Sequence, residues 1–195
     1  FATYVHMFLA AFPVGCLRVL LSAAARASAI LITRVDEAHG GESVRRLLLD
    51  ACGSLPPLVR VGFQAEEFLH VGTGKRLPLD AFRGRSALLF SGIGNAESFR
   101  VLVAGLGIAV SEMLAFPDHV HYTPDMVDSI RTRAKAAGAD LLVTTEKDAD
   151  KVAPLFAPED DCWAVRLRTE ILSGQEVLER LLGFDSAPGG TGDHA

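Results

Sequence analysis

The chain has 195 residues, of which 49% are hydrophobic, and this is enough apolar material for the core of one domain and a piece of another. A formal net charge of -5 provides no broad cationic surface, so we expect no nucleic-acid partner. The three cysteines, Cys16, Cys52 and Cys162, have no CxxC spacing, which argues against a disulfide framework or a zinc site and favours a reducing compartment.

The first part of the chain has an α/β pattern. Residues 1–17 contain no Asp, Glu, Lys or Arg, and they are short for a membrane span of about 20 residues. This stretch fits a buried element, altered sequence at a truncated end, or contact with a membrane. Downstream we expect a helix over 16–27, a buried strand over Ser28–Thr33 and a helix over Glu42–Cys52.

The next segment, residues 58–83, is predicted to be a linker. Pro56-Pro57 breaks the chain before it, and two short strands, Leu58–Gln64 and Phe68–Val71, precede a turn at Gly72-Thr-Gly74.

From Gly84 onward strands and helices alternate, which predicts a parallel sheet with helices on both faces. The expected elements are a strand over Ser86–Ser91, a helix from Asn95, a strand over Ile108–Leu114, a helix from Thr123, and a strand over Asp140–Thr144. Asn95 and Thr123 are suited to cap their helices, and Gly138 to end the second.

The end of the chain is predicted to hold one more strand and helix. The strand covers Cys162–Arg168, and Ser173 and Glu176 have the spacing of a capping box at the start of the helix. Residues 185–195 are expected to form a loose tail.

Three loops carry residues suited to chemistry. The turn Phe90-Ser-Gly-Ile-Gly-Asn95 follows a strand and could present backbone N–H groups to an anion. Phe116-Pro-Asp-His-Val-His-Tyr-Thr123 could pair the Asp118 carboxylate with the His119 imidazole, or Asp118 could satisfy loop amides beside solvated histidines. Thr144-Thr-Glu-Lys-Asp148 could hold a nucleotide or phosphate, or could be an ordinary capped helix with a surface ion pair.

A fourth segment, Gly72-Thr-Gly-Lys75, looks like part of a phosphate-binding loop. The motif G-x-x-x-x-G-K-[ST] would need glycine at position 69 and Ser or Thr at 76, where this chain has Leu69 and Arg76. The segment also lies between predicted hairpin strands, so we interpret it as a turn.

Together and in this order, the three loops resemble the C-terminal motifs of the tetraacyldisaccharide 4'-kinase family. Leu17-Arg18 and Ala27–Arg34 resemble an upstream segment of that family, so the similarity covers about residues 12–182. Residues 1–11 do not match the family segment expected there, and Val120 stands where a second histidine is frequent.

The resemblance implies a fold and an activity. The expected fold is P-loop-NTPase-like, a three-layer α/β/α parallel-sheet lobe with a β-ribbon linker and the tail of a first lobe. It divides the chain into the end of an N-terminal lobe (1–57), the ribbon (58–83), a C-terminal lobe (84–184) and a disordered tail (185–195). Family enzymes transfer the γ-phosphate of ATP, with Mg²⁺, to the 4'-hydroxyl of a tetraacyl disaccharide 1-phosphate at the cytoplasmic face of the bacterial inner membrane.

The resemblance also assigns site residues. His119 matches a family histidine that works as a dyad with an acid from the first lobe, and Asp118 lies beside it. Positions expected to line the nucleotide or substrate side of the cleft are Arg34, Ser91, Gly92, Gly94, Asn95, Thr144, Thr145, Glu146, Lys147 and Asp148. The family phosphate-binding loop and its main Mg²⁺ ligands belong to the first lobe, so no metal site is expected in this chain.

The leading hypothesis is therefore part of a lipid A 4'-kinase that is inactive alone, with ATP and an acylated disaccharide phosphate as partners. In the whole family protein the membrane surface is a further partner, and this fragment by itself would be cytoplasmic. The alternative is a stand-alone α/β domain that binds a nucleotide or phosphosugar without catalysis. A small hydrolase built on Asp118 and His119 lacks a nucleophile elbow.

Overall fold

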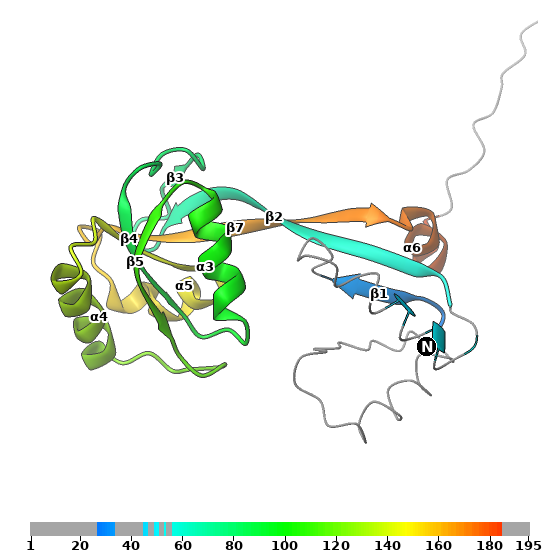
Figure 1. Cartoon of the computed structure of the whole chain (residues 1–195), viewed down its shortest axis with the longest axis horizontal. Coiled ribbons are helices and arrows are strands. Elements are labelled where there is room, and N and C mark those ends of the chain that lie inside the picture. Colours follow the sequence, from blue (N-terminus) through cyan, green and yellow to red (C-terminus); the bar gives the residue numbers. More distant parts are fainter. Residues whose placement is uncertain (1–26, 34–44, 47–48, 51–52, 54–55, 185–195) are drawn as a thin grey trace, which may run out of the picture. The chain divides into compact units, whose positions relative to one another are not determined.

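A computed structural model describes residues 27–33, 45–46, 49–50, 53 and 56–184. The chain forms two compact units, one over Gln64–Arg168 and the other within Phe1–Phe63 and Thr169–Ala195 (Figure 1). Most of the helix predicted over 16–27, the tail over 185–195 and the candidate residue Arg34 lie outside the described residues.

The unit Gln64–Arg168 is built on a mostly parallel sheet. Its strands lie in the order β2-β7-β6-β4-β5, and β3 pairs with β2. Neighbours among β7, β6, β4 and β5 are parallel, whereas β2 and β3 are antiparallel. The bounds are β2 Leu58–His70, β3 Arg76–Leu77, β4 Ser86–Ser91, β5 Ala109–Ala115, β6 Leu141–Thr145 and β7 Cys162–Ser173.

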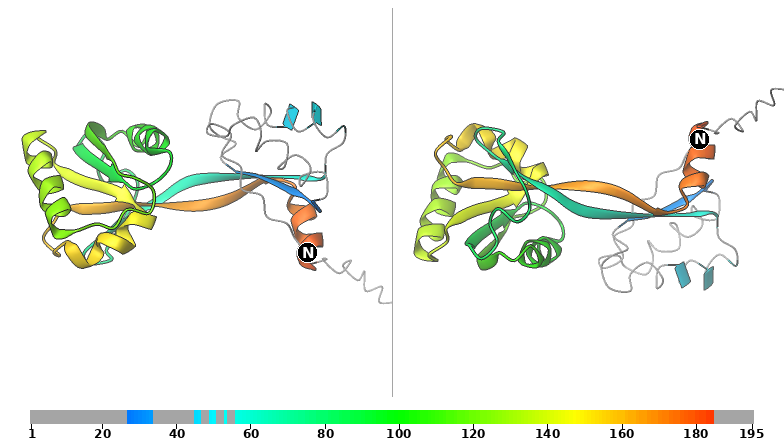
Figure 2. Two further views of the ribbon diagram at one scale, coloured as in Figure 1. Left: turned by 90° about the horizontal axis from the view of Figure 1, so that it is seen from below. Right: turned by 90° about the horizontal axis from the view of Figure 1, so that it is seen from above.

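Helices cover both faces of this sheet, because alternate residues of the central strand β4 point to opposite sides. Leu88 and Phe90 pack in one core with α4 and α5, whereas Ala87 and Leu89 pack in the other core with α3. Figure 2 shows α3 and α5 on opposite sides of the strands. The helices are α3 Ala96–Gly105, α4 Pro124–Ala136 and α5 Glu146–Val152, with a 3-10 turn η1 at Ala153–Leu155. The predicted three-layer α/β/α arrangement is confirmed.

The expected local signals start and stop these helices. The Asn95 side chain accepts a hydrogen bond from Ser98 N, and the Thr123 hydroxyl accepts one from Met126 N, with Pro124 at the first helical position. Gly138 has a φ of 63°, the left-handed conformation that ends a helix at little cost.

The prediction of two strands over Leu58–Gln64 and Phe68–Val71 was wrong, because β2 runs without a break through Ala65-Glu-Glu67. The Glu67 carboxylate is partly buried, and it is paired with Arg76 at 3.2 Å and Arg166 at 3.1 Å. These partners compensate its charge, and one of them lies 99 residues away.

The other unit contains a short strand and the last helix. Strand β1, Ile30–Thr33, is parallel to the start of β2, with Ile30 opposite Leu58. Helix α6, Gln175–Leu182, begins after Gly174 in a left-handed conformation without a side-chain cap. The predicted capping box at Ser173 was wrong, because β7 continues through that residue. Among the described residues, no helix has the length and apolar content of a bilayer span.

Candidate active site

Three loops meet at the carboxyl edge of the sheet in the unit Gln64–Arg168. They follow β4, β5 and β6, which are parallel neighbours in the order β6-β4-β5. Lys147 Nζ, after β6, donates to Asp118 Oδ1, after β5, at 2.7 Å. Gly92 N, after β4, donates to Asp148 Oδ2 at 2.8 Å. The three loops singled out in the sequence therefore form one cluster, at the edge where open α/β sheets bind ligands.

The Asp118–His119 pair is exposed at this edge. Asp118 Oδ1 accepts hydrogen bonds from Lys147 and from the backbone N–H of His119, at 3.0 Å. The Lys147 hydrogen bond is the largest of the effects that lower the pKa of Asp118. His119 Nε2 lies 3.7 Å from Asp118 Oδ2, and the imidazole is 82% exposed. Asp118 thus satisfies a loop amide and also lies beside the imidazole.

The backbone of His119 has an unusual conformation. Its φ is 60°, and it is the only non-glycine residue with positive φ in the described part of the chain. The left-handed region is uncommon for residues with a Cβ, although His is enriched there. The conformation has a cost that the contacts of the neighbouring residues must offset.

Asp148 connects the turn after β4 with the start of α5 through buried hydrogen bonds. Its side chain is fully buried and accepts hydrogen bonds from Gly92 N, from Thr145 Oγ1 at 2.8 Å and from Lys151 Nζ at 3.1 Å. Burial and the nearby Asp148 charge raise the pKa of the Tyr122 phenol well above its ordinary range. The Tyr122 hydroxyl makes no hydrogen bond to a described residue. Asp148 was predicted as a ligand-binding residue, but its oxygen atoms face the protein.

The hydroxyls at the end of β6 also have hydrogen-bond partners within the protein. Thr144 is buried, and its Oγ1 donates to the Phe90 carbonyl at 2.8 Å. Thr145 caps α5 by accepting from Asp148 N, as expected of a hydroxyl at a helix start. Glu146 is paired with Arg166 at 3.2 Å. These side chains hold the loop in shape, and Lys147 is the member of this segment that is exposed.

The turn after β4 has a similar division of roles. Ser91 is fully buried, and its Oγ has no hydrogen-bond partner among the described residues. Gly92 is buried against the other two loops, whereas Gly94 is exposed. The Asn95 amide caps α3. Gly92 and the Ser91 carbonyl, which accepts from Phe116 N at 2.8 Å, both contact the loop that carries Asp118 and His119.

The sequence interpretation missed two residues that contribute to the cluster. Lys151 is paired with the Asp148 carboxylate, and the i,i+3 spacing of the two on α5 was the available signal. Val120 packs against the turn after β4, where its Cγ1 atom would collide with a Cβ on Gly92. No local pattern indicated this contact, because 28 positions separate the two residues in sequence.

The segment Gly72-Thr-Gly-Lys75 is a turn between antiparallel strands, as the sequence indicated. The N–H groups of Gly72 and Thr73 donate to His70 Nδ1 at 3.2 and 3.1 Å. Amides that would cradle a phosphate in a phosphate-binding loop are therefore directed at a side chain of the turn itself.

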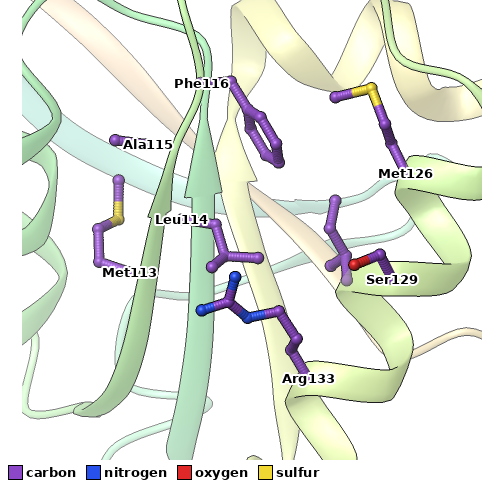
Figure 3. Close-up of a pocket in the computed structure, with 8 residues that line it drawn as sticks. Met113, Leu114, Ala115, Phe116, Met126, Ser129 and Arg133 are labelled. Carbon is purple, nitrogen blue, oxygen red and sulfur yellow. The ribbon is translucent and has the colours of Figure 1, made fainter.

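A groove of about 340 Å³ lies between β5 and α4 (Figure 3). Leu114, Phe116 and Met126 contribute apolar surface, and Arg133 on α4 is paired with Glu112. Elsewhere in the described residues, no group of three or more His, Cys, Asp or Glu side chains is placed to hold a metal ion.

Comparisons with known proteins identify one family. A family model described as tetraacyldisaccharide-1-P 4'-kinase, LpxK, matches residues 8–184. A protein named tetraacyldisaccharide 4'-kinase from Anaeromyxobacter sp. (strain Fw109-5) is 35% identical over 91% of this chain and 47% of its own length. One of the same name from Syntrophobacter fumaroxidans is 36% identical over 70% of this chain and 36% of its own length.

A solved structure shares the fold. It is the "apo" form of LpxK from Aquifex aeolicus in complex with ATP, with a TM-score of 0.53 and 22% identity. The match covers 84% of this chain and 44% of that one. The chain thus spans less than half the length of each of these relatives.

Proposed function

The chain belongs to the tetraacyldisaccharide-1-P 4'-kinase family, and from this membership we propose that it forms the His119-bearing half of a lipid A 4'-kinase. The proposed reaction transfers the γ-phosphate of ATP to the 4'-hydroxyl of a tetraacyl disaccharide 1-phosphate. The 195 residues contain no G-x-x-x-x-G-K-[ST] motif, so the phosphate-binding loop is assigned to the half of the relatives that this chain does not match.

One observation carries the proposal: the loops after β4, β5 and β6 converge around the Asp118–His119 pair. Hydrogen bonds link the loops, among them Lys147 to Asp118 at 2.7 Å and Gly92 to Asp148 at 2.8 Å. His119 is exposed at this edge, so a substrate can reach its imidazole. An exposed imidazole held by hydrogen-bonded loops favours a catalytic role for His119 over a purely structural one.

The roles of the residues follow from their positions. In the reaction the hydroxyl oxygen bonds to the γ-phosphorus, the bond from that phosphorus to the β,γ-bridging oxygen breaks, and ADP leaves. The hydroxyl proton passes to an acid of the other half, and His119 orients that acid as its dyad partner. Asp118 lies beside the imidazole and orients it, and Lys147 holds Asp118 in place.

Mg²⁺, when bound with ATP, neutralises charge on the phosphate oxygens. We assign the metal ligands to the other half, together with the phosphate-binding loop. Residues facing the nucleotide are proposed from the exposed part of the cluster, chiefly Lys147 and Gly94. The proposed site of action is the cytoplasmic face of the inner membrane, where a peripheral protein can meet an acylated substrate.

A phosphoryl-transfer assay tests the proposal. The chain would be assayed alone and joined behind the N-terminal half of the Anaeromyxobacter Fw109-5 relative, with ATP, Mg²⁺ and the tetraacyl disaccharide 1-phosphate. We expect no turnover by the chain alone and measurable turnover by the fusion. His119→Ala in the fusion should lower kcat about 10²- to 10⁴-fold, the usual contribution of a group in proton transfer.

The matched control is His121→Ala, which removes a second exposed histidine of the same loop and should leave kcat within about threefold, because its ring makes no identified contact in the cluster. Equal losses in the two variants would contradict the role of His119. ATP binding by the chain, with an unchanged Kd in His119→Ala and no turnover by the fusion, would instead support a stand-alone binding domain.

A further inference from the structure

The α-carbon of Gly92 lies where the three loops of the cluster meet. A Cβ at this position would lie 2.5 Å from Val120 Cγ1, 3.2 Å from Asp148 Oδ1 and 3.3 Å from the Pro117 carbonyl oxygen. Non-bonded carbon atoms pack at about 3.5–4.0 Å, so no side chain fits here unless something moves. The requirement for glycine is one of space, since Gly92 is not among the glycines with positive φ.

The turn that carries Gly92 is held firmly. The Gly92 N–H donates to the fully buried Asp148 carboxylate, which Thr145 and Lys151 also contact. The Ser91 carbonyl accepts from Phe116 N at 2.8 Å, so the preceding residue is bound to the strand end that leads into the Asp118–His119 loop. When space at Gly92 is short, the facing loop is therefore the part that yields.

The facing loop has less support of its own. Val120 directly follows His119, and Val120 N donates to the Pro117 carbonyl at 3.2 Å, which closes the loop into a tight turn. Pro117, Asp118 and His119 are exposed. The Val120 side chain thus contacts the turn after β4, and through this contact the turn can determine the position of the neighbouring His119.

We propose that Gly92 is a positioning residue for His119: the missing side chain lets Val120 close on the turn after β4, and this contact fixes the imidazole against the reacting groups. The inference rests on the proposed role of His119 in phosphoryl transfer. The atoms nearest to a Cβ on Gly92 belong to Val120, Asp148 and Pro117, so Gly92 acts on His119 through Val120.

The contact can be tested by exchanging its two sides. Gly92→Ala adds a methyl group that would lie 2.5 Å from Val120 Cγ1, and Val120→Ala removes that atom. We expect Gly92→Ala to displace the His119 imidazole resonances in NMR spectra of the chain, and Gly92→Ala with Val120→Ala to return them toward the wild-type positions. His70 is the internal control, because it is the last residue of β2 and its Nδ1 accepts from Gly72 and Thr73.

The kinase fusion supplies the second readout. A displacement of about 1 Å can cost 10²-fold in rate, so Gly92→Ala should lower kcat about 10- to 100-fold while KM for ATP changes less than threefold. The double variant should recover to within about threefold of Val120→Ala. A general loss of folding would not be reversed by removing the two methyl groups of Val120. If Gly92→Ala fails to fold, Val120→Ala alone must still shift or broaden the His119 resonances.

The two proposals fail in different ways. An active fusion that His119→Ala leaves unaffected would remove the proposed role of His119, whatever the spectra show. A strong effect of His119→Ala, together with unchanged kcat and unchanged His119 resonances in Gly92→Ala, would overturn the positioning role alone. In that case Val120 would simply rotate toward solvent and the loop would stay in place.

Discussion

Replacing Asp148 by alanine should destabilise the unit Gln64–Arg168 strongly, because the side chain is buried and accepts hydrogen bonds from groups around it. The carboxylate is 0% exposed and accepts from Gly92 N, Thr145 Oγ1 and Lys151 Nζ. Hydrogen bonds to a charged group contribute about 1.5–3 kcal/mol each, and a buried donor left unpaired costs about 1–3 kcal/mol. Thr145 and the 28% exposed Lys151 can recover contacts with water, whereas the Gly92 N–H cannot.

From these contributions we expect Asp148→Ala to lower the free energy of unfolding by about 3–5 kcal/mol, the range for breaking a buried ion pair. Asp148→Asn keeps the shape and one acceptor for Gly92 N, so it should cost only about 1–2 kcal/mol. The difference between the two variants separates the contribution of the hydrogen bond to Gly92 N, which Asp148→Asn keeps, from the contribution of the charge, which both variants lose.

Urea unfolding followed by tryptophan fluorescence measures both values. Trp163 is the only tryptophan of the chain, is 5% exposed and lies in the same unit as Asp148. Asp128→Ala is the control, because its 71% exposed carboxylate on α4 pairs with Arg131 at the surface and should contribute less than about 1 kcal/mol. A loss below 1 kcal/mol in Asp148→Ala would refute the reasoning from burial.

Three further predictions use other contacts. Lys147→Met should return the pKa of Asp118 toward 3.8 in a ¹³C NMR titration. Folding lowers the pKa of Asp118, so its ion pair stabilises the folded protein at pH values above the pKa that Asp118 has in the unfolded chain. This stabilisation is lost as the pH falls through the pKa of the folded protein. His119→Val should cost about 1–2 kcal/mol in urea unfolding and His119→Gly almost nothing, because φ is 60°. Phe90→Ala, in the core, should cost about 3–5 kcal/mol, whereas the 56% exposed Val101→Ala should change stability by less than about 0.5 kcal/mol.

Features that depend on neighbouring residues were predictable from the sequence. Asn95 and Thr123 cap their helices because a side-chain oxygen needs only the N–H group three residues ahead. Strand β4 has the predicted bounds, since a run of apolar residues between turn signals suffices to define a buried strand.

Features that depend on distant partners were not predictable. The polar segment at Glu67 reads as a break, yet Arg76 and Arg166 allow the strand to continue. At Gly174 an added Cβ would lie 2.5 Å from the Leu58 carbonyl oxygen, a close approach that the Ser173 spacing signal did not indicate. Arg166 lies 99 residues from Glu67, Arg76 belongs to the neighbouring strand β3, and Leu58 is far from Gly174 in sequence. No pattern of adjacent residues indicates such partners.

In the candidate site, too, some features depend on neighbouring residues and others on distant partners. The sequence by itself determined which residue types follow each strand, and the parallel pattern placed these loops at one edge of the sheet. Only the tertiary structure decided that Asp148 points inward to Gly92 while Lys147 points outward to Asp118. Two adjacent residues at the start of a helix point in different directions, and what each one meets depends on the spatial order β6-β4-β5, which no local pattern encodes.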